Sequence, residues 1–332
     1  MASGIRIGLD EVLVHFSELE EPRSEVNLRH SLESVVVIAL MAVLAGASGP
    51  TAIARWALIK AELLTTLLPL PHGVPRKEVF RRVLSALQPE TFQVCFVHWL
   101  PSLRAAAAVA TGIDQPVFAV EGKTLRRSHD QSKGWGALHS VSVWASDFGL
   151  SLGQMATDQK SKALFSNGKG TAIPELLKRV DLRGAIITMD AMGTQKAIAK
   201  AIVDGGADYV LALKGNQETL HDAVIAYVNE QMQTDFANIG ARRHLTREKG
   251  HGREEIRHYV QMPAPKTLPG FELWKGLQTI GVAMLSCVRD GKEAAEIRDF
   301  ISSLPLGVRR FAHAVRSHWG IENTCHWSLD FT

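Results

Sequence analysis

The order of apolar runs after residue 112 constrains the fold of this chain more than any other feature of its sequence. Three short strand-like runs come first, with gaps of turn length between them: Val117–Val120, Leu138–Ala145 and Leu150–Met155. A helix, an apolar strand, a second helix and a fifth strand then alternate: Ile173–Val180, Ala185–Met189, Gln195–Val203 and Asp208–Leu213. Three strands followed by alternating helices and strands predict an antiparallel meander that continues as a mixed α/β sheet.

Two of these strands run directly into a carboxylate. The first leads to Glu121, and the fourth, Ala185–Met189, leads to Asp190. A charge at the end of a buried strand is costly unless it is paired or binds a metal. In a sheet with this order of elements the first and fourth strands can lie side by side, which would bring the two carboxylates together.

A third acid completes the candidate site. Glu322 lies near the end of a helical run, Val308–Leu329, with His318 and His326 one turn away on either side. Oxygen ligands from three separated segments suit Mg²⁺ or Mn²⁺, and two such ions would promote in-line attack on a phosphodiester. The alternative is structural: Asp190 caps the following helix, Glu121 starts a turn and Glu322 pairs with an arginine.

Residues up to about 110 are predicted to form helices separated by Gly and Pro. The expected helices are Ser34–Ala45, Thr51–Leu67, one opened by Pro75 and one from Pro89 to a break near Pro101. A helix, a tight turn and a helix fit both a DNA-reading module and a plain bundle. Basic and acidic residues are equal here, ten each. Any DNA contact therefore requires one basic face, for which the candidates are Arg76, Lys77, Arg81 and Arg82.

Composition limits the class of protein without selecting a function. The formal charge of +3 permits nucleic-acid binding but does not require it. Three widely spaced cysteines, Cys95, Cys287 and Cys325, allow no CxxC motif, so a reducing cytoplasm is expected. The apolar run Val35–Ala47 is too short to cross a bilayer and predicts a buried core helix, and no signal peptide or other membrane segment is expected.

Other motifs are weaker. Gly122-Lys123-Thr124 resembles the end of a phosphate-binding loop, but Val117 stands where that loop needs glycine. The histidines and the cysteine near the end of the chain have no tetrahedral zinc spacing. Trp319 and Trp327 fit either core packing or base stacking.

Several words of the sequence resemble the H-repeat-associated insertion-sequence transposases. They are Val-Glu-Gly-Lys-Thr-Leu-Arg (120–126), Ala-Ile-Pro-Glu-Leu-Leu (172–177), Ile-Thr-Met-Asp-Ala-Met-Gly-Thr-Gln (187–195), Asp-Tyr-Val-Leu-Ala-Leu-Lys-Gly-Asn-Gln (208–217), His-Gly-Arg (251–253) and His-Trp-Gly-Ile-Glu-Asn (318–323). His15-Phe16, Pro22-Arg23 and Val79-Phe80-Arg81-Arg82-Val83 are similar to that family's helical domain. The resemblance covers nearly the whole chain in order.

The resemblance implies a DDE transposase with a helical domain at 1–110 and an RNase H-like catalytic domain at 111–332. Glu121, Asp190 and Glu322 would be the three catalytic, metal-binding acids. The first departs from the family, which has Asp at the position of Glu121. Further departures are Arg127 in place of a usual glycine, a short insertion at Leu164–Gly170 and an end at Thr332, before the family's basic tail.

The implied substrate is double-stranded DNA, at the ends of a mobile element and at its target. Phosphate contacts are expected from Lys123, Arg126, Arg316 and His318, and further DNA contacts from Arg242, Arg243 and Arg253. The last three lie in a β-rich insertion, about 228–305, between the second and third acids. Two rivals remain: a degenerate, non-catalytic DNA-binding relative, which the substitution at Glu121 favours, and a nuclease that cuts without joining. A homodimer is compatible with these features.

Overall fold

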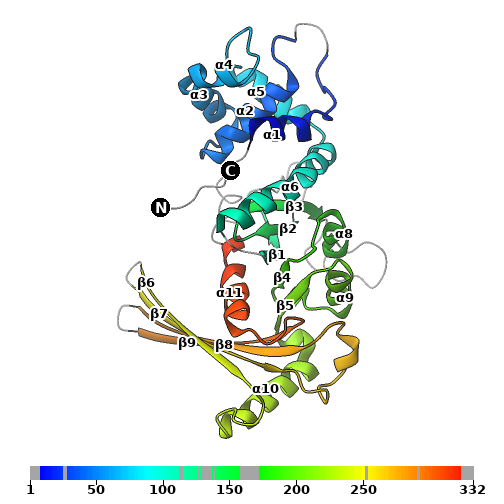
Figure 1. Cartoon of the computed structure of the whole chain (residues 1–332), viewed down its shortest axis with the longest axis vertical. Coiled ribbons are helices and arrows are strands. Elements are labelled where there is room, and N and C mark those ends of the chain that lie inside the picture. Colours follow the sequence, from blue (N-terminus) through cyan, green and yellow to red (C-terminus); the bar gives the residue numbers. More distant parts are fainter. Residues whose placement is uncertain are drawn as a thin grey trace. The chain divides into compact units, whose positions relative to one another are not determined.

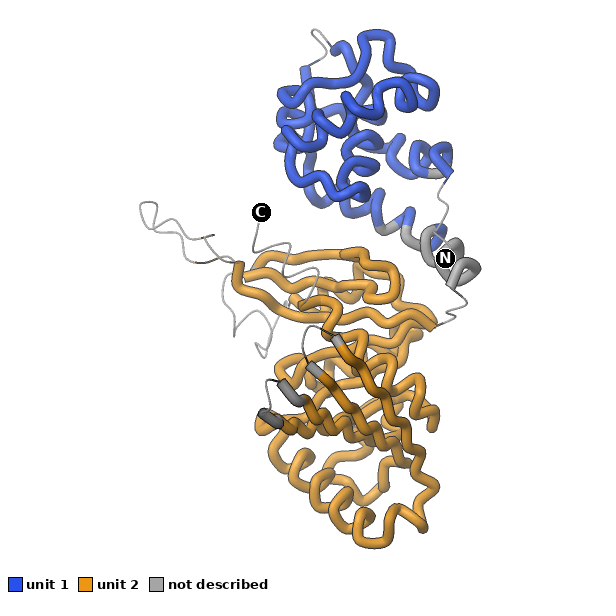
Figure 2. Tube along the Cα trace, turned by 90° about the vertical axis from the view of Figure 1, so that its left-hand side faces the viewer, with its two compact units in different colours: residues 1–113, 332 blue, residues 114–331 orange. Residues whose placement is uncertain are grey.

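The computed structural model describes residues 8–24, 28–111, 115–125, 128, 137, 139–157, 172–250, 253–289 and 292–322. The chain divides into two compact units, residues 1–113 and residues 114–331 (Figure 2). Each unit is described by itself below.

Helices make up the described elements of the first unit. They are α1 (Leu9–Phe16), α2 (Leu32–Leu44), α3 (Gly49–Ile59), α4 (Ala61–Leu67), α5 (Lys77–Ala86) and α6 (Pro89–Thr111). Ser31 caps α2, because its side chain accepts a hydrogen bond from the backbone of Ser34. Four consecutive residues of α2, 35–38, are at most 1% exposed, which confirms the predicted core helix.

Two helix boundaries differ from the sequence prediction. The helix expected over Thr51–Leu67 is two helices, because the backbone of Lys60 leaves helical geometry at φ −100° and ψ 15°. The helix expected to end near Pro101 continues to Thr111. A proline removes a single backbone hydrogen bond, and a helix that is packed elsewhere can continue through it.

Among the described residues, no single helix is both long and apolar enough to cross a membrane. Helices α2 and α3 reach that length and apolar character only as a pair, and the chain bends by 94° between them.

The second unit is built on one mixed sheet (Figure 1). Within the described residues its strands follow the order β3-β2-β1-β4-β5-β9-β8-β7-β6. The bounds are β1 (Val117–Thr124), β2 (His139–Ala145), β3 (Leu150–Thr157), β4 (Ile186–Met189), β5 (Asp208–Leu213), β6 (Arg242–Gly250), β7 (Arg253–Pro263), β8 (Thr279–Arg289) and β9 (Lys292–Ser302). Strands β1, β4 and β5 are parallel to one another, and the other pairs are antiparallel. The predicted mixed α/β sheet is confirmed, and the order of β1 to β5 is that of an RNase H-like sheet.

The β-rich segment extends this same sheet. Strand β9 pairs directly with β5, with Leu213 opposite Asp299, and β8, β7 and β6 follow outwards. Strand β6 was not predicted from the sequence, because its nine residues are mostly charged and contain no apolar run. Helix α10 (Glu218–Gln233) precedes this antiparallel part.

Helix α11 (Val308–His318) covers one face of the sheet, and α8 (Ala172–Arg179) and α9 (Lys196–Asp204) lie on the other side (Figure 1). Phe311 of α11 is fully buried in a core with Val117, Ile186 and Phe300. A Cβ atom at Gly281 of β8 would overlap the ring of Phe311. Glycine at this position therefore allows α11 to approach the sheet closely.

Candidate active site

The register of the sheet places the first two acids side by side. Parallel strands β1 and β4 pair Val120 with Met189, and the next residues along the two strands are Glu121 and Asp190. Neighbouring strands lie about 4.8 Å apart, and residues in register point to the same face. The predicted adjacency of the first and fourth strands is therefore confirmed. Glu121 is not at the end of its strand as expected, because β1 continues to Thr124 in pairing with β2.

The turn after Asp190 is held by several hydrogen bonds. The Asp190 carboxylate accepts a bond of 3.1 Å from the Gly193 backbone, which makes it the N-cap of a short 3₁₀ turn, Ala191–Gly193. Asn216 donates to the Ala191 carbonyl at 2.5 Å. Gln217 donates to the Thr194 carbonyl at 3.0 Å. The Lys-Gly-Asn-Gln word after β5 thus fixes the backbone that presents Asp190.

Helix α11 brings Glu322 to the same face. Thr188, two residues before Asp190, is hydrogen-bonded to His318 at 2.9 Å. His313 forms an ion pair of 2.9 Å with Asp147 on the β2–β3 turn, and this contact raises the pKa of His313. His313 therefore anchors α11 by this ion pair. Glu322 follows one turn after His318 and is exposed.

All three acids line one cavity of about 250 Å³, together with His318 and Trp319. Further polar residues of this cavity were not predicted from the sequence: Lys214, His221, Arg298 and Asp299. His221 and Asp299 form an ion pair of 3.1 Å. Lys214 directly follows β5, so the rule that identified Asp190 could also have identified Lys214. His221 lies on α10 and Arg298 and Asp299 lie on β9, and no local signal marks these three residues.

The electrostatics of this cavity centre on Glu121. Burial, reinforced by the negative charges of Glu322 and Asp190, raises the pKa of Glu121 to about 7. Lys123, two residues further along the same face, has a smaller and opposite effect. Glu121 thus combines partial burial with two negative neighbours, an arrangement in which a cation would favour the ionised form.

The donor set suits a hard divalent cation, although it is not a preassembled metal cluster. Within the described part of the chain, no three His, Cys, Asp or Glu side chains form a group that could hold a metal. The three acids nevertheless supply only oxygen ligands to one cavity, which is the chemistry that Mg²⁺ and Mn²⁺ prefer. The structural alternative is correct only in part for Asp190, which caps the 3₁₀ turn Ala191–Gly193, whereas the N-cap of α9 is Gln195. Among the described residues, however, no arginine forms an ion pair with Glu322.

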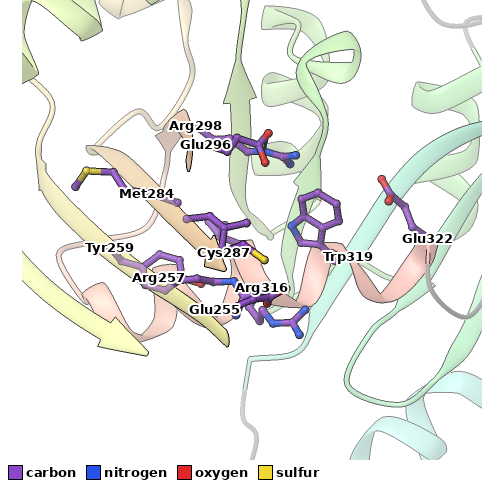
Figure 3. Close-up of a pocket in the computed structure, with 13 residues that line it drawn as sticks. Glu255, Arg257, Tyr259, Met284, Cys287, Glu296, Arg298, Arg316, Trp319 and Glu322 are labelled. Atoms are coloured by element: carbon purple, nitrogen blue, oxygen red, sulfur yellow. Dashed lines mark hydrogen bonds and ion pairs between the residues drawn. The ribbon is translucent and has the colours of Figure 1, made fainter. Parts of the chain in front are cut away.

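A second cavity of about 360 Å³ adjoins the first and shares Arg298, Trp319 and Glu322 with it. Its floor consists of alternate residues of β7, β8 and β9, which place Arg257 in register with Leu285 and Glu296. In Figure 3 the Trp319 ring lies between Glu322 and the strands that carry Arg257 and Cys287. The guanidinium of Arg298 lies 4.3 Å from the centre of a Trp319 ring.

The arginines of this second cavity are paired within the protein. Glu248 contacts both Arg257 and Arg316 at 3.1 Å. Arg257 also pairs with Glu255, and Arg298 pairs with Glu296 at 2.7 Å. The contact with Arg316 is the main reason that the pKa of Glu248 is lowered.

Two further predicted DNA contacts, Arg242 and Arg243, do not line the cavity of the acids. Arg243, on β6, is bonded to Asp235 and lies 5.1 Å from the centre of the Phe236 ring. Both of these turn residues have positive φ angles, so Arg243 stabilises a strained turn. Arg242 is exposed on the same strand. Arg126 and the side chain of Arg253 lie outside the described residues, as do His326 and Trp327.

Comparison with known families agrees with this geometry. Residues 111–332 match the family described as Transposase DDE domain, and residues 13–100 match the family described as DDE_Tnp_1-associated. The H repeat-associated putative transposase YhhI of Escherichia coli strain K12 is 35% identical over 97% of this chain and 82% of that protein. The putative transposase YncI of Escherichia coli O157:H7 is 34% identical over 98% of this chain and 80% of that protein. The chain, with its three acids around one cavity of an RNase H-like sheet, belongs to the DDE transposase family.

Proposed function

We propose that this protein cuts DNA at the ends of an insertion-sequence element and joins those ends to a target DNA. Glu121, Asp190 and Glu322 are the catalytic acids. The observation that carries this assignment is that Glu121 and Asp190 lie beside each other on the adjacent strands β1 and β4. Glu322, one helical turn after the end of α11, lines the same cavity. Three acids from three distant segments that share one cavity are better explained by a shared function than by three separate structural roles.

The three carboxylates would hold Mg²⁺ or Mn²⁺ in a two-metal site. When bound, such ions lower the pKa of an attacking water or 3′-hydroxyl and stabilise the leaving oxygen. The raised pKa of Glu121 supports this assignment, because a carboxylate among like charges gains most from a nearby cation. Asp190 presents its carboxylate from a turn fixed by Asn216 and Gln217, which limits how far this ligand can move.

The second cavity, beside the acids, suits a DNA strand that leaves the active site. Its arginines, Arg257, Arg298 and Arg316, lie on the sheet face and helix that also carry the acids. Arginine binds phosphate oxygens through paired N–H groups, which positions the strand without reading its sequence. Lys123 and His318 would contact phosphates nearer to the acids. Double-stranded DNA is thus the proposed partner, and a homodimer would hold two element ends at once.

The test is a cleavage assay with labelled oligonucleotides copied from the DNA that flanks the gene. We expect strand cleavage in Mg²⁺ and Mn²⁺, none in EDTA, and joined products when target DNA is added. Cleavage without joined products would instead identify a nuclease. Binding without cleavage in either metal would identify a DNA-binding protein that has lost activity, for which the substitution at Glu121 would be the first suspect.

A further inference from the structure

The helical unit contains a cavity of its own, far in sequence from the catalytic acids. Its volume is about 730 Å³, and it lies among the loop that precedes α2, the turn that precedes α5, and α5 itself. Basic side chains dominate the lining: Arg23, Arg29, His30, His72, Arg76 and Arg82, with Glu78 as the acid. This concentration of positive charge contrasts with the even balance of charge in the helical segment as a whole.

Most of these cations have no counter-ion among the described residues. Within the described residues, no ion pair involves Arg29, Arg76 or Arg82. Arg23 is the exception: it pairs with Glu21 at 2.6 Å and donates to the His30 carbonyl at 2.9 Å, which ties the loop together. Glu78 is the acid among the described lining residues, and its carboxylate lies 3.8 Å from the Lys77 ammonium, so part of its charge is already offset.

Two further observations point to an anion. The cavity includes the first turn of α5, whose N-cap residue, Arg76, makes no side-chain capping bond. Free backbone N–H groups at a helix N-terminus attract negative charge. The pKa of His30 is lowered mainly by burial, and the positive charges of His72, Arg23 and Arg29 add to this effect. The Nδ1 atom of His30 is buried without a hydrogen-bond partner among the described residues.

We propose that this cavity binds a phosphate group of the DNA backbone, and that Arg76 and Arg82 are its principal ligands. The helical unit is then a DNA-holding module that acts by phosphate contacts. The proposal rests on the proposed function, since it takes the same DNA as its ligand, but it concerns a separate site. Inorganic phosphate offers the same chemistry, so the test must distinguish the free anion from the DNA backbone.

Helix α5 supplies a matched pair of variants. Arg76→Gln with Arg82→Gln removes two charges that line the cavity. Lys77→Gln with Arg81→Gln removes two charges from adjacent positions of the same helix that do not line it. All four side chains are exposed, so both double variants of the full chain are expected to fold. Equal melting temperatures would verify that.

DNA affinity is measured by fluorescence anisotropy between 50 and 300 mM salt, without divalent metal. The cavity variant should bind at least about tenfold more weakly than the control variant at low salt, with a log–log salt slope reduced by about 0.9, the value for one lost phosphate contact. In parallel, inorganic phosphate should raise the melting temperature of the parent and the control variant but not of the cavity variant.

Equal DNA affinities and slopes for the two double variants would overturn the proposal while leaving the proposed function intact. A difference confined to inorganic phosphate would also overturn it, because the occupant would then be a free anion. If even the parent binds no DNA at low salt, the proposed function fails and the cavity proposal fails with it.

Discussion

The cavity on the sheet and the cavity in the helical unit differ in the sign of the charge that lines them. Glu121, Asp190 and Glu322 gather in the first. Arg29, Arg76 and Arg82 gather in the second. In each case several like charges line one cavity, and each cavity would therefore gain from a ligand of opposite charge.

The comparison also separates chemistry from positioning. The acids are presented by adjacent strands and a turn that is hydrogen-bonded at several points, a rigid arrangement suited to fixed reaction geometry. The arginines lie on loops and on one exposed helix face, where long side chains can follow a flexible phosphate backbone. We therefore expect changes in the first cavity to affect the rate, and changes in the second to affect affinity and its salt dependence.

The largest expected effect comes from removing one carboxylate charge. Asp190→Asn or Glu322→Gln should reduce strand cleavage by about 10³-fold or more, because residues of a catalytic unit act together. Single-turnover gel assays at saturating DNA measure the rate, with Arg76→Gln/Arg82→Gln as the comparison that should lose affinity but keep the rate. A cleavage rate within threefold of the parent, roughly, for Asp190→Asn would remove it from the catalytic set.

Glu121→Asp should act in the opposite direction. Shortening the side chain by one methylene moves the carboxylate back by about 1.5 Å, to the reach that the family uses. A misplacement of about 1 Å can cost up to 10²-fold in rate, so we expect a gain of about tenfold in Mg²⁺ and a smaller gain in Mn²⁺. If the variant is slower than the parent in both metals, Glu121 is already a working ligand.

Glu121→Gln should increase the free energy of unfolding at high pH, because it removes a buried negative charge beside Glu322 and Asp190. The pKa of Glu121 is raised from an ordinary 4.5 to about 7, so the folded state binds its proton more tightly than the unfolded state. The contribution to stability is therefore present below about pH 4.5 and is lost as the pH rises through about 7. Without metal, the variant should exceed the parent by about 3 kcal/mol at pH 8 and match it near pH 4. Urea unfolding in EDTA measures this, and a pH-independent difference would contradict it.

The smallest effect is expected in the second cavity, where the arginines form ion pairs with glutamates of the protein. Glu248→Gln should release Arg316, while Arg257 keeps its pairing with Glu255. It should tighten DNA binding roughly threefold and steepen the salt slope by about 0.9. Glu175→Gln is the control, because Glu175 pairs with Lys178 at 2.9 Å on α8 and lines none of the cavities described above. Anisotropy titrations of DNA with the two variants should give different binding curves. Coincident curves would show that the second cavity does not contact DNA.

The sequence predicted those parts of the site that depend on short segments and on their order along the chain. The run from Val117 into Glu121 and the run from Ala185 into Asp190 predicted two strands, and the order of strands and helices along the chain allowed these two to be neighbours. Strand β6 escaped prediction, because an edge strand can be charged on both faces. The cavity of the helical unit was predicted only in part. Arg76 and Arg82 were candidates for a basic face, whereas Arg23 and Arg29, which are distant in sequence, join them only through packing. Lys214 was missed although its signal was present.

The central claim is that the three acids form one metal site. Its most direct test is a titration of the whole chain with Mn²⁺ at pH 8, in which electron paramagnetic resonance measures the bound ion. The account predicts saturable binding to the parent, clear weakening in Asp190→Asn and in Glu322→Gln, and unchanged binding in Arg76→Gln/Arg82→Gln. Mn²⁺ binding that is equally strong in Asp190→Asn, in Glu322→Gln and in the parent would contradict the assignment of the three acids as one metal site.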